Sequence, residues 1–386
     1  MRIARITLSS GNRVACALGP AKILDNCLFP AKLPMPLGGT MARLNLGVVG
    51  VGVMGRRHAE NLRCRVPNAR LVAVCDSDTR RAVQVAAELE IDSSCASIEE
   101  MVARKDIDAV VIASPGKFHA ASTRIAAEAG KDVLCEKPLG LDLPEIEAAL
   151  AAVARHGVRL QVGHMRRFDR AYGTARKRIE AGGIGEPIIF KSIGRDTEPP
   201  PLDYFQSGLN GMLFLDSSVH DFDLARWLMG DEVAEVQAYS STKVLPYLTQ
   251  FNDIDAAVVN LRFERGSIGN VESFRQARYG YDIRTEVVGT KGTILIGHLR
   301  HTAELVLTTQ GAVHDVVSHW LDRFEDAYLR EVCAFVDMVA SGGQPAVTGE
   351  DGLRAVAIGL AAERSCRESR PVRVAPVTTQ RTRVAS

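Results

Sequence analysis

The chain has 386 residues, of which 46% are hydrophobic, and its formal net charge at pH 7 is +1. This composition predicts globular domains with room for two cores, and the balanced charge excludes the strongly basic surface typical of nucleic-acid binding. No apolar run approaches the length of a membrane-spanning helix, and the first residues do not resemble a secretory signal. We expect no nucleic-acid or membrane partner and a small, uncharged ligand.

Eight cysteines are scattered along the chain without a CxxC pair. Such spacing argues against a disulfide framework or a thiolate metal site, so we expect a reducing, cytoplasmic setting. The histidine pairs His298 and His301, and His314 and His319, lack a helical acidic partner, so we predict no metal site.

Residues 1–40 do not have the pattern of a domain. Basic residues outnumber the single acid, Asp25, and the segment ends in the proline- and glycine-rich sequence FPAKLPMPLGGT. The first periodic apolar segment begins just after Met41. We therefore favour Met41 as the natural start, with residues 1–40 as a translation-start artefact or a disordered tail; a transit peptide is the alternative. Mass spectrometry of the native amino terminus distinguishes these hypotheses.

Residues 46–55, LGVVGVGVMG, join an apolar run to a helix-like segment through a glycine cluster. In a strand, turn and helix unit of this kind, Gly50 permits the sharp turn, Gly52 lets the backbone approach a pyrophosphate, and Gly55 lets the helix pack closely on the strand. The phosphates then lie at the start of the helix, where backbone N–H groups are free. The pattern predicts a dinucleotide-binding turn, and a purely structural glycine-rich turn is the alternative.

A second apolar run, residues 71–75, ends in Asp76, close to the spacing expected of an acid that binds the adenosine ribose hydroxyls. A carboxylate at this position repels a 2′-phosphate, so the sequence favours NAD over NADP. Arg80 and Arg81 follow closely. They would suit a 2′-phosphate, or they simply lie on a solvated helix face.

From residue 45 to about residue 164, apolar runs alternate with segments of helical length. This alternation is typical of a doubly wound parallel sheet covered by helices, and it predicts an N-terminal Rossmann domain over residues 41–164. The strands are expected at 46–50, 70–75, near Cys95, 109–113, 133–135 and 159–163. Ser114 and Pro115 follow one of these strands, where loops line the ligand crevice.

After a predicted helix at 168–181 the period changes to two, in the runs PIIFKSI, VAEVQAYS, AAVVNLRF, SIGNVESFRQ, IRTEVVG, GTILIG and ELVLTT. Together these runs predict a C-terminal α+β domain, residues 165–374, with a large, mostly antiparallel open sheet. Helices are expected at 324–340 and 352–366, PVRV is expected to rejoin the sheet, and residues 375–386 form a tail. An open sheet with an exposed face usually finds a cover, so we expect a homo-oligomer, a tetramer or a dimer.

Two motifs place chemistry-bearing residues after a predicted strand or at a helix start. Glu136-Lys137-Pro138 follows the strand VLC, and in MLFLDSSVHDFDLARW the residues Asp216 and His220 would share a helix face if the helix starts that early. A histidine beside a carboxylate is the arrangement that orients a general base. The alternatives are a surface turn with a charge pair for the first motif and a capped, charged helix start for the second.

Three further segments carry polar residues that suit the same crevice. QVGHMRRFD places Arg166 and Arg167 just after a strand, where arginines hold hydroxyls or phosphates, although one of two consecutive arginines is commonly solvated. RYGYD contains Tyr279 and Tyr281, whose hydroxyls suit a polyol, although tyrosines on a half-buried sheet are often core residues. Asp196 lies in the loop RDTEPPP, which is expected to hang over the crevice.

Taken together, these segments resemble the Gfo/Idh/MocA oxidoreductase family from Asn45 to about Val374. The matching elements are GVVGVGVMGRRH, EKP, QVGHMRRFD, the pair formed by Asp216 and His220, and ARYGYDIRTEVVG. The stretches GxMRRFD and RYGYD are the more specific ones, and they point to the inositol dehydrogenase branch of the family. One departure is His164, which stands where phenylalanine is usual in that branch.

The resemblance implies NAD-dependent oxidation of a secondary ring alcohol of a cyclic polyol to a ketone, with myo-inositol oxidised to 2-keto-myo-inositol (scyllo-inosose). It implies that Lys137 touches the reacting hydroxyl, that His220 takes its proton, and that Asp216 orients His220 and binds a neighbouring hydroxyl. A histidine near neutral pKa suits that task. The cofactor-binding residues implied are Gly50, Gly52, Val53, Met54, Gly55, Asp76, Ser114, Pro115, His119, Glu136, Lys137 and Arg166. The substrate-binding residues implied are Lys137, Arg166, Asp196, Asp216, His220 and Tyr279, with Tyr281 beside them.

Two other hypotheses stay open. The first is a dehydrogenase or reductase of another sugar or polyol, such as scyllo-inositol, chiro-inositol or an aldose derivative. The second is a non-catalytic NAD-binding regulator, because fold alone does not fix function. The presence of both Lys137 and His220 argues against the regulator.

Overall fold

The computed structural model describes residues 43–91, 93–297, 300–302 and 304–377. The expected leader, residues 1–40, and most of the expected tail, residues 375–386, lie outside the described residues. Among the described residues, none of the helices combines the length and the apolar character needed to cross a membrane.

The first sheet has six parallel strands in the order β3-β2-β1-β4-β5-β6. They are β1 (Leu44–Val49), β2 (Ala69–Cys75), β3 (Ser94–Cys95), β4 (Ala109–Ile112), β5 (Asp132–Glu136) and β6 (Leu160–Gly163). The inner strands read as apolar runs because both faces of the sheet are covered, and all four residues of β4 are buried. The strand order reverses between β1 and β4, and ligands of doubly wound sheets bind beyond the carboxyl ends of the strands at such a point. The predicted Rossmann sheet is confirmed.

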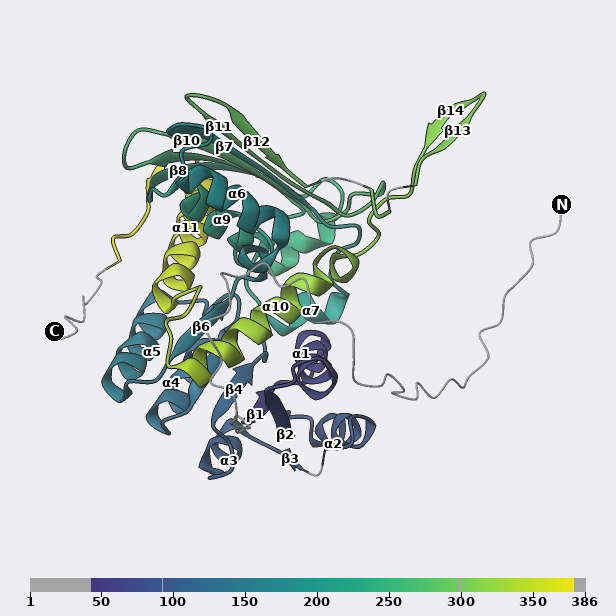
Figure 1. Cartoon of the computed structure of the whole chain (residues 1–386). Helices are drawn as coiled ribbons and strands as arrows, with labels where there is room; N and C mark the ends of the chain where they lie inside the picture. Colours follow the sequence, from purple (N-terminus) through teal and green to yellow (C-terminus); the bar gives the residue numbers. More distant parts are fainter. Residues whose placement is uncertain (1–42, 92, 298–299, 303, 378–386) are drawn as a thin grey trace. The chain divides into compact units, whose positions relative to one another are not determined.

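Helices connect these strands and cover both faces of the sheet (Figure 1). They are α1 (Val53–Cys64), α2 (Thr79–Glu88), α3 (Ile98–Ala103), the short 3₁₀ helix η1 (Gly116–Phe118), α4 (His119–Glu128) and α5 (Leu143–His156). Asp78, Ser97 and Asp142 cap α2, α3 and α5 by accepting hydrogen bonds from N–H groups of the first turn. These side chains satisfy backbone groups that a helix start leaves unpaired.

The second sheet has seven strands in the order β12-β11-β7-β10-β9-β8-β15. Neighbouring strands are antiparallel except β7 and β10, which run parallel. The strands are β7 (Pro187–Arg195), β8 (Val233–Ser241), β9 (Ala256–Phe263), β10 (Ile268–Phe274), β11 (Asp282–Gly289), β12 (Thr293–Ile296) and β15 (Val372–Arg373). The last of these is the PVRV segment, which rejoins the sheet as expected. The predicted C-terminal α+β fold with a mostly antiparallel sheet is confirmed.

One face of this second sheet is covered by α6 (Arg170–Glu180), α9 (Val219–Met229) and α11 (Gly349–Glu368), and no helix of the described chain covers the other (Figure 1). In β9, Ala257, Val259, Leu261 and Phe263 are buried, and the residues between them are exposed or half-buried. This alternation follows from the two-residue period of a strand whose one face meets a core.

The long helix α10 (Trp320–Ser341) contributes to the cores of both sheets. Its Phe324 and Tyr328 belong to the core under the second sheet, whereas Val332 and Phe335 join the core of the first. A segment from the predicted C-terminal domain therefore helps to build the core of the N-terminal one.

One of the period-two runs does not join the large sheet. ELVLTT contributes β13 (Val306–Thr308), whose partner in the described structure is β14 (Gly311–Val313), in a hairpin that projects from the rest of the fold (Figure 1). Every residue of these two strands is exposed. The prediction that all seven runs share one sheet is wrong here, because the period marks a strand and does not show which sheet receives it.

Candidate active site

The glycine cluster between β1 and α1 has the close packing that the sequence predicts. Gly50 adopts a φ of +82°, and a Cβ atom added there would lie 2.5 Å from the backbone nitrogen of Ser114. A Cβ atom added to Gly55 would lie 1.7 Å from the carbonyl oxygen of Gly50, whereas one added to Gly52 would meet no atom within 4 Å. The turn and the helix packing thus require Gly50 and Gly55, and Gly52 leaves its outer side open.

The start of α1 fits an anion. Its N-cap is Gly52, which offers no capping side chain, and its first turn carries no acidic residue. Val53 in this turn is exposed and Met54 is half-buried. The N–H groups of the first turn carry the positive end of the helix dipole and have no partner within the helix. These residues fit the pyrophosphate of a dinucleotide.

Asp76 follows β2 and lies beside this turn. Its Oδ2 accepts a hydrogen bond from the backbone N–H of Val51 at 3.0 Å, and its Oδ1 accepts one from the N–H of Asp78 at 2.9 Å. The guanidinium group of Arg81 lies 3.4 Å from Oδ2, whereas the Arg80 side chain is almost fully exposed. The acid is held where a ribose-binding carboxylate is expected, and the charge of Arg81 is paired with it.

Two of the expected cofactor residues are engaged by the protein itself. The ring nitrogens of His119 lie 2.6 Å from the carbonyl oxygens of Ser114 and Pro138, so this side chain braces two loops. Glu136 Oε1 lies 2.7 Å from His58 Nε2. Both side chains therefore support the loops after β4 and β5. The Ser114 hydroxyl is buried and has no partner in the described part of the chain, so it remains available to a ligand.

Lys137 follows β5 and reaches the one-turn helix α8 (Leu213–Asp216). Its Nζ donates a hydrogen bond to the carbonyl oxygen of Asp216 at 2.7 Å and lies 3.9 Å from Asp216 Oδ1. Asp216 Oδ2 accepts a hydrogen bond from Arg275 at 2.8 Å, and the Tyr204 hydroxyl donates to the same carboxylate. Burial disfavours the charged form of Asp216, but Arg275 and Lys137 outweigh burial, and its pKa lies below the ordinary value.

Asp216 and His220 do not share a helix face, because the helix that holds His220 does not start early enough to include Asp216. Asp216 ends α8 and His220 lies in the first turn of α9, with two serines between the helices. The hydroxyl of Ser218 donates to a backbone carbonyl of α8, and serine side chains compete with helix continuation in this way. No hydrogen bond joins Asp216 to His220 among the described residues, since the Asp216 carboxylate is held by Arg275 and Tyr204.

His220 is buried and neutral. Burial, followed by the positive charges of Lys137 and Arg166, holds its pKa well below the ordinary 6.5. Its Nδ1 has no partner in the described structure. The ring stands edge-on to His164, with 5.9 Å between the ring centroids, and His164 is itself buried with both ring nitrogens lacking a described partner. A neutral imidazole near a lysine is able to accept a proton from a hydroxyl.

Arg166 is a buried charge with partners of its own. One terminal nitrogen donates to Asp221 Oδ1 at 2.6 Å, and the guanidinium group hydrogen-bonds the Tyr281 hydroxyl. Tyr279, in contrast, is 46% exposed, and its hydroxyl donates to Asp282 at 2.7 Å. Of the two tyrosines in RYGYD, Tyr281 contacts the cluster through Arg166. No contact of the described structure brings Tyr279 to Lys137 or His220, which differs from its expected place among the substrate residues.

Asp196 follows β7 and faces the same group of residues. The Ser217 hydroxyl donates to its Oδ2 at 3.2 Å. Burial and then the nearby Asp216 raise its pKa to about 6, although Arg275 acts in the opposite direction. This carboxyl therefore titrates close to neutral pH at a place where it can meet a polar ligand.

Sequence reasoning missed Arg275 and Tyr204, the two residues that hold Asp216. Arg275 directly follows β10 in SFRQAR, and a charge that ends a partly buried strand was the available signal. Tyr204 lies in the short helix α7 (Leu202–Ser207), which comes after a proline-rich loop and carries no periodic pattern. No sequence signal pointed to Tyr204.

A second polar cluster begins at the same EKP motif. In the described chain, His58, Glu136 and Glu331 form the group that has the donor types and spacing of a metal site, with ligand atoms within 4.8 Å of one another. All three residues are buried. Burial and the neighbouring Glu136 raise the pKa of Glu331 well above its ordinary value, which favours a proton on this carboxyl. The cluster is able to neutralise its charge with that proton or with a divalent cation.

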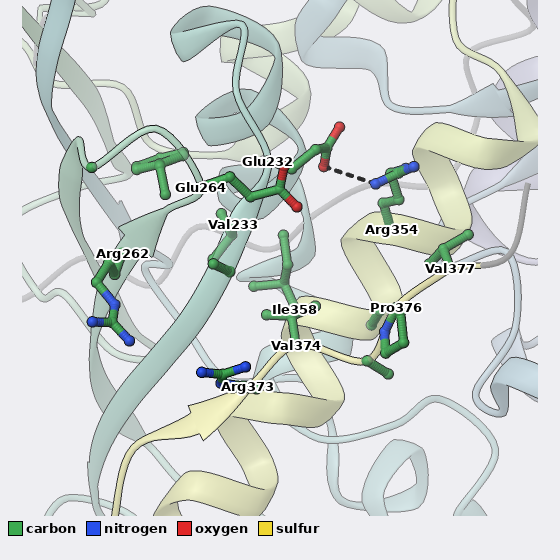
Figure 2. A pocket seen from close by; sticks show the side chains of 15 residues that line it. Glu232, Val233, Arg262, Glu264, Arg354, Ile358, Arg373, Val374, Pro376 and Val377 are labelled. Carbon is green, nitrogen blue, oxygen red and sulfur yellow. Dashed lines mark ion pairs between the residues drawn. The ribbon is translucent and has the colours of Figure 1, made fainter.

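A pocket of about 690 Å³ lies elsewhere, between α11, β8, β9 and the segment after β15 (Figure 2). Glu232 at its rim is already paired with Arg226 at 2.6 Å and with Arg354 at 3.4 Å, and Arg262 is paired with Glu235 at 2.8 Å. None of the expected site residues lines this pocket. We therefore place the candidate active site at the cluster around Lys137.

Two family models match the chain. Residues 44–164 match the model described as the oxidoreductase family, NAD-binding Rossmann fold. Residues 176–374 match the model described as the oxidoreductase family, C-terminal alpha/beta domain. The two matches cover the six-stranded sheet and the seven-stranded sheet.

Similar proteins share both parts. A scyllo-inositol 2-dehydrogenase (NAD(+)) of Bacillus subtilis is 40% identical over 332 residues, which cover 86% of this chain and 96% of that protein. A myo-inositol 2-dehydrogenase of Thermotoga maritima is 38% identical over 335 residues, which cover 86% of this chain and 99% of that protein. The crystal structure of a scyllo-inositol dehydrogenase from Lactobacillus casei, with bound cofactor NAD(H) and scyllo-inositol, superposes with a TM-score of 0.81 at 30% identity and covers 86% of this chain and 99% of that one.

Proposed function

Because this chain belongs to the Gfo/Idh/MocA oxidoreductase family, we propose that it oxidises a secondary ring alcohol of an inositol to a ketone, with NAD as the hydride acceptor. The observation that carries the proposal is the contact of Lys137 with Asp216 close to a neutral His220. Alcohol oxidation needs a base, a fixed positive charge and acceptors for neighbouring hydroxyls, and these three residues offer them.

Each residue has a separate task in this proposal. Bound NAD supplies a cationic nicotinamide ring that takes up the hydride. His220 accepts the hydroxyl proton, since its low pKa keeps it unprotonated near neutral pH. The Lys137 ammonium group stabilises the negative charge that develops on the substrate oxygen. Asp216 and Asp196 accept hydrogen bonds from hydroxyls on neighbouring carbons of the substrate. Arg166 forms hydrogen bonds with Asp221 and Tyr281 and so holds these side chains in place beside the site.

The first substrate we propose is myo-inositol, oxidised to 2-keto-myo-inositol. The RYGYD and MRRFD segments and the similarity to the Thermotoga maritima protein support it. The second candidate is scyllo-inositol. It is favoured by the similarity to the Bacillus subtilis protein. His164, whose ring stands edge-on to His220 where phenylalanine is usual, is a departure that bears on the choice among polyols.

A spectrophotometric screen for NADH tests the function and the substrate together. The purified protein is given NAD or NADP with myo-, scyllo- and chiro-inositol and several aldoses. NAD reduction that is strongest with myo-inositol supports the first substrate, and activity confined to another polyol replaces it. No turnover with any polyol, despite measurable NAD binding, contradicts the enzyme and favours the regulator.

We also propose a homo-oligomer, a tetramer or a dimer, formed through the open face of the second sheet. On that face Tyr239 is 62% exposed and lies beside Val258, which is 40% exposed, and Ile268 is 52% exposed. A second copy would bury these apolar side chains. Val258→Arg is expected to lower the mass measured by light scattering, whereas Val83→Arg, at an exposed valine of α2, is expected to leave it unchanged. Equal masses for both variants contradict this interface.

We also propose that the protein works in the cytoplasm and takes part in the catabolism of an inositol. Burial raises the pKa of the Cys75 and Cys135 thiols to about 12, so these thiols stay protonated and unreactive. Such thiols are compatible with a reducing compartment. Fractionation of cells followed by detection of the protein tests the setting.

A further inference from the structure

Arg275 is held on every side of its guanidinium group. It directly follows β10 and is completely buried. One terminal nitrogen donates to Asp216 Oδ2 at 2.8 Å, the other donates to Asp253 Oδ2 at 2.9 Å, and Nε donates to the Ile254 carbonyl oxygen at 3.2 Å. The Phe205 ring packs against the group, with 5.2 Å from Cζ to the ring centroid. Arg275 is therefore occupied by the protein and is not free to bind substrate.

Arg275 and Asp253 together clamp the helix α8 at both ends. Asp253 Oδ1 accepts a hydrogen bond from the backbone N–H of Leu213, the first residue of α8, at 2.9 Å. Asp216 is the last residue of α8, and it is bonded to Arg275. Because Arg275 also pairs with Asp253, one chain of buried ion pairs joins the two ends. A helix of a single turn has little stability of its own, so these partners fix its place.

This clamp determines which oxygen of Asp216 faces Lys137. Arg275 occupies Oδ2, and Oδ1 lies 3.9 Å from Lys137 Nζ, which also donates to the Asp216 carbonyl oxygen. Burial disfavours a charged carboxylate at this place, and Arg275 is the strongest of the groups that counteract burial and lower the pKa of Asp216. Arg275 thus acts on the reacting groups through Asp216.

We propose that Arg275 is a positioning residue, which pairs with the Asp216 carboxylate and fixes α8 so that Asp216 Oδ1 faces Lys137. The proposal rests on the dehydrogenase function proposed for the same site. Asp253 is the anchor of Arg275 in this arrangement.

The test compares Arg275→Met and Arg275→Lys with Arg226→Met in the full-length protein. Arg226 is the matched control, because it is also buried and also bonds two acids, Glu232 at 2.7 Å and Asp351 at 3.3 Å. We expect Arg275→Met to lower kcat/KM for the inositol on the order of 100-fold, the effect of misplacing a catalytic group by about 1 Å. NADH binding is expected to stay unchanged.

The pH profile separates positioning from a merely structural role. In Arg275→Met the acid limb of kcat/KM is expected to move to higher pH, because Asp216 and its neighbour Asp196 both lose the positive charge that lowers their pKa. Arg275→Lys keeps a positive charge and the acid limb, but it recovers only part of the rate, because an ammonium group cannot bridge two carboxylates as a guanidinium does. A loss no larger than that of Arg226→Met, with an unmoved acid limb, overturns the proposal.

Separate measurements show whether the variants fold and whether the proposed function holds. Melting curves show whether Arg275→Met folds with Asp253 left without its cation, and Arg275→Lys carries the test if it does not. If the wild type reduces no NAD with any inositol, the proposed function fails, and crystal structures still decide the positioning role. In the structure of Arg275→Lys or Arg275→Met, Asp216 Oδ1 is expected to leave Lys137. An unchanged Asp216 overturns the proposal in that case.

Discussion

Glu136 and Lys137 are neighbours in the sequence, yet each belongs to a polar cluster of a different kind. The open cluster consists of Lys137, Asp216 and His220. The side chains of Lys137 and Asp216 are still 20% and 17% exposed, so solvent or a ligand reaches them. In this cluster cations keep the carboxylate ionised, and the histidine stays neutral.

The closed cluster consists of His58, Glu136 and Glu331. His58 and Glu331 are completely buried, and both carboxylate oxygens of Glu331 lack a hydrogen-bond partner in the described structure. Burial and then Glu136 raise the pKa of Glu331, and no cation is among the causes. Two neighbouring residues thus lead to opposite electrostatic environments. Lys137 places a positive charge beside the Asp216 carboxylate, whereas Glu136 places a second carboxyl beside Glu331. The environment of Asp216 suits proton transfer and the binding of hydroxyls. The environment of Glu331 makes the stability of the fold depend on whether Glu331 carries a proton.

Removing the base of the open cluster is expected to have the largest effect. His220→Ala should lower kcat by about 100- to 10,000-fold, because a positioned base contributes that much to proton transfer. NAD binding should change little, since the NAD residues lie on other elements. Steady-state kinetics and NADH fluorescence measure the two effects.

The control for this variant is His156→Ala, at an exposed histidine near the end of α5. It should leave kcat unchanged. Near-normal activity of His220→Ala would show that the base has been assigned to the wrong residue, and the open cluster would then lose its catalytic interpretation.

A matched pair of amide substitutions in the closed cluster is expected to affect stability rather than turnover. Glu136→Gln should lower the free energy of unfolding by about 2 kcal/mol, because it weakens a buried hydrogen bond to a charged group. Glu331→Gln should be close to neutral, because the amide replaces a protonated carboxyl of the same shape. Denaturant unfolding measures both values.

The pH dependence of Glu331→Gln sharpens this prediction. The folded-state pKa of Glu331 is raised above 4.5, so its contribution to stability is full below that pH and declines as the pH rises. The variant should therefore become more stable relative to the wild type as the pH increases. A chelator should leave the wild-type melting temperature unchanged, and a lower melting temperature would instead indicate a metal ion in the closed cluster.

Patterns among neighbouring residues were enough to predict the fold and the nucleotide-binding turn. The site was predicted only in part, because it is held together by residues that lie far apart in the sequence. The glycines and the alternating runs are read from neighbouring residues, so Gly50, Gly55 and both sheets were predicted, apart from the ELVLTT run, which forms a separate hairpin. Arg275 lies 59 residues from Asp216 along the chain, and only the folded sheet brings them together. The break between α8 and α9 falls at Ser217 and Ser218, and the spacing of Asp216 and His220 does not reveal it.

Asp196 offers the smallest and most selective test, because it is a carboxyl with a raised pKa beside the open cluster. Its pKa of about 6 means that it gains a proton as the pH falls through that value, and it then accepts hydrogen bonds less well. We expect the KM for the inositol to rise a few-fold below about pH 6 in the wild type, and to be higher but independent of pH in Asp196→Asn.

The stability of the same variant supplies a second measurement. Because the folded-state pKa of Asp196 is raised, its contribution to stability is present at low pH and is lost as the pH rises through about 6. Asp196→Asn should therefore gain stability relative to the wild type over that range, although solvent near this half-buried group keeps the gain small. If KM keeps its pH dependence in Asp196→Asn, a different titrating group causes it, and the Asp196 carboxyl has no part in substrate binding.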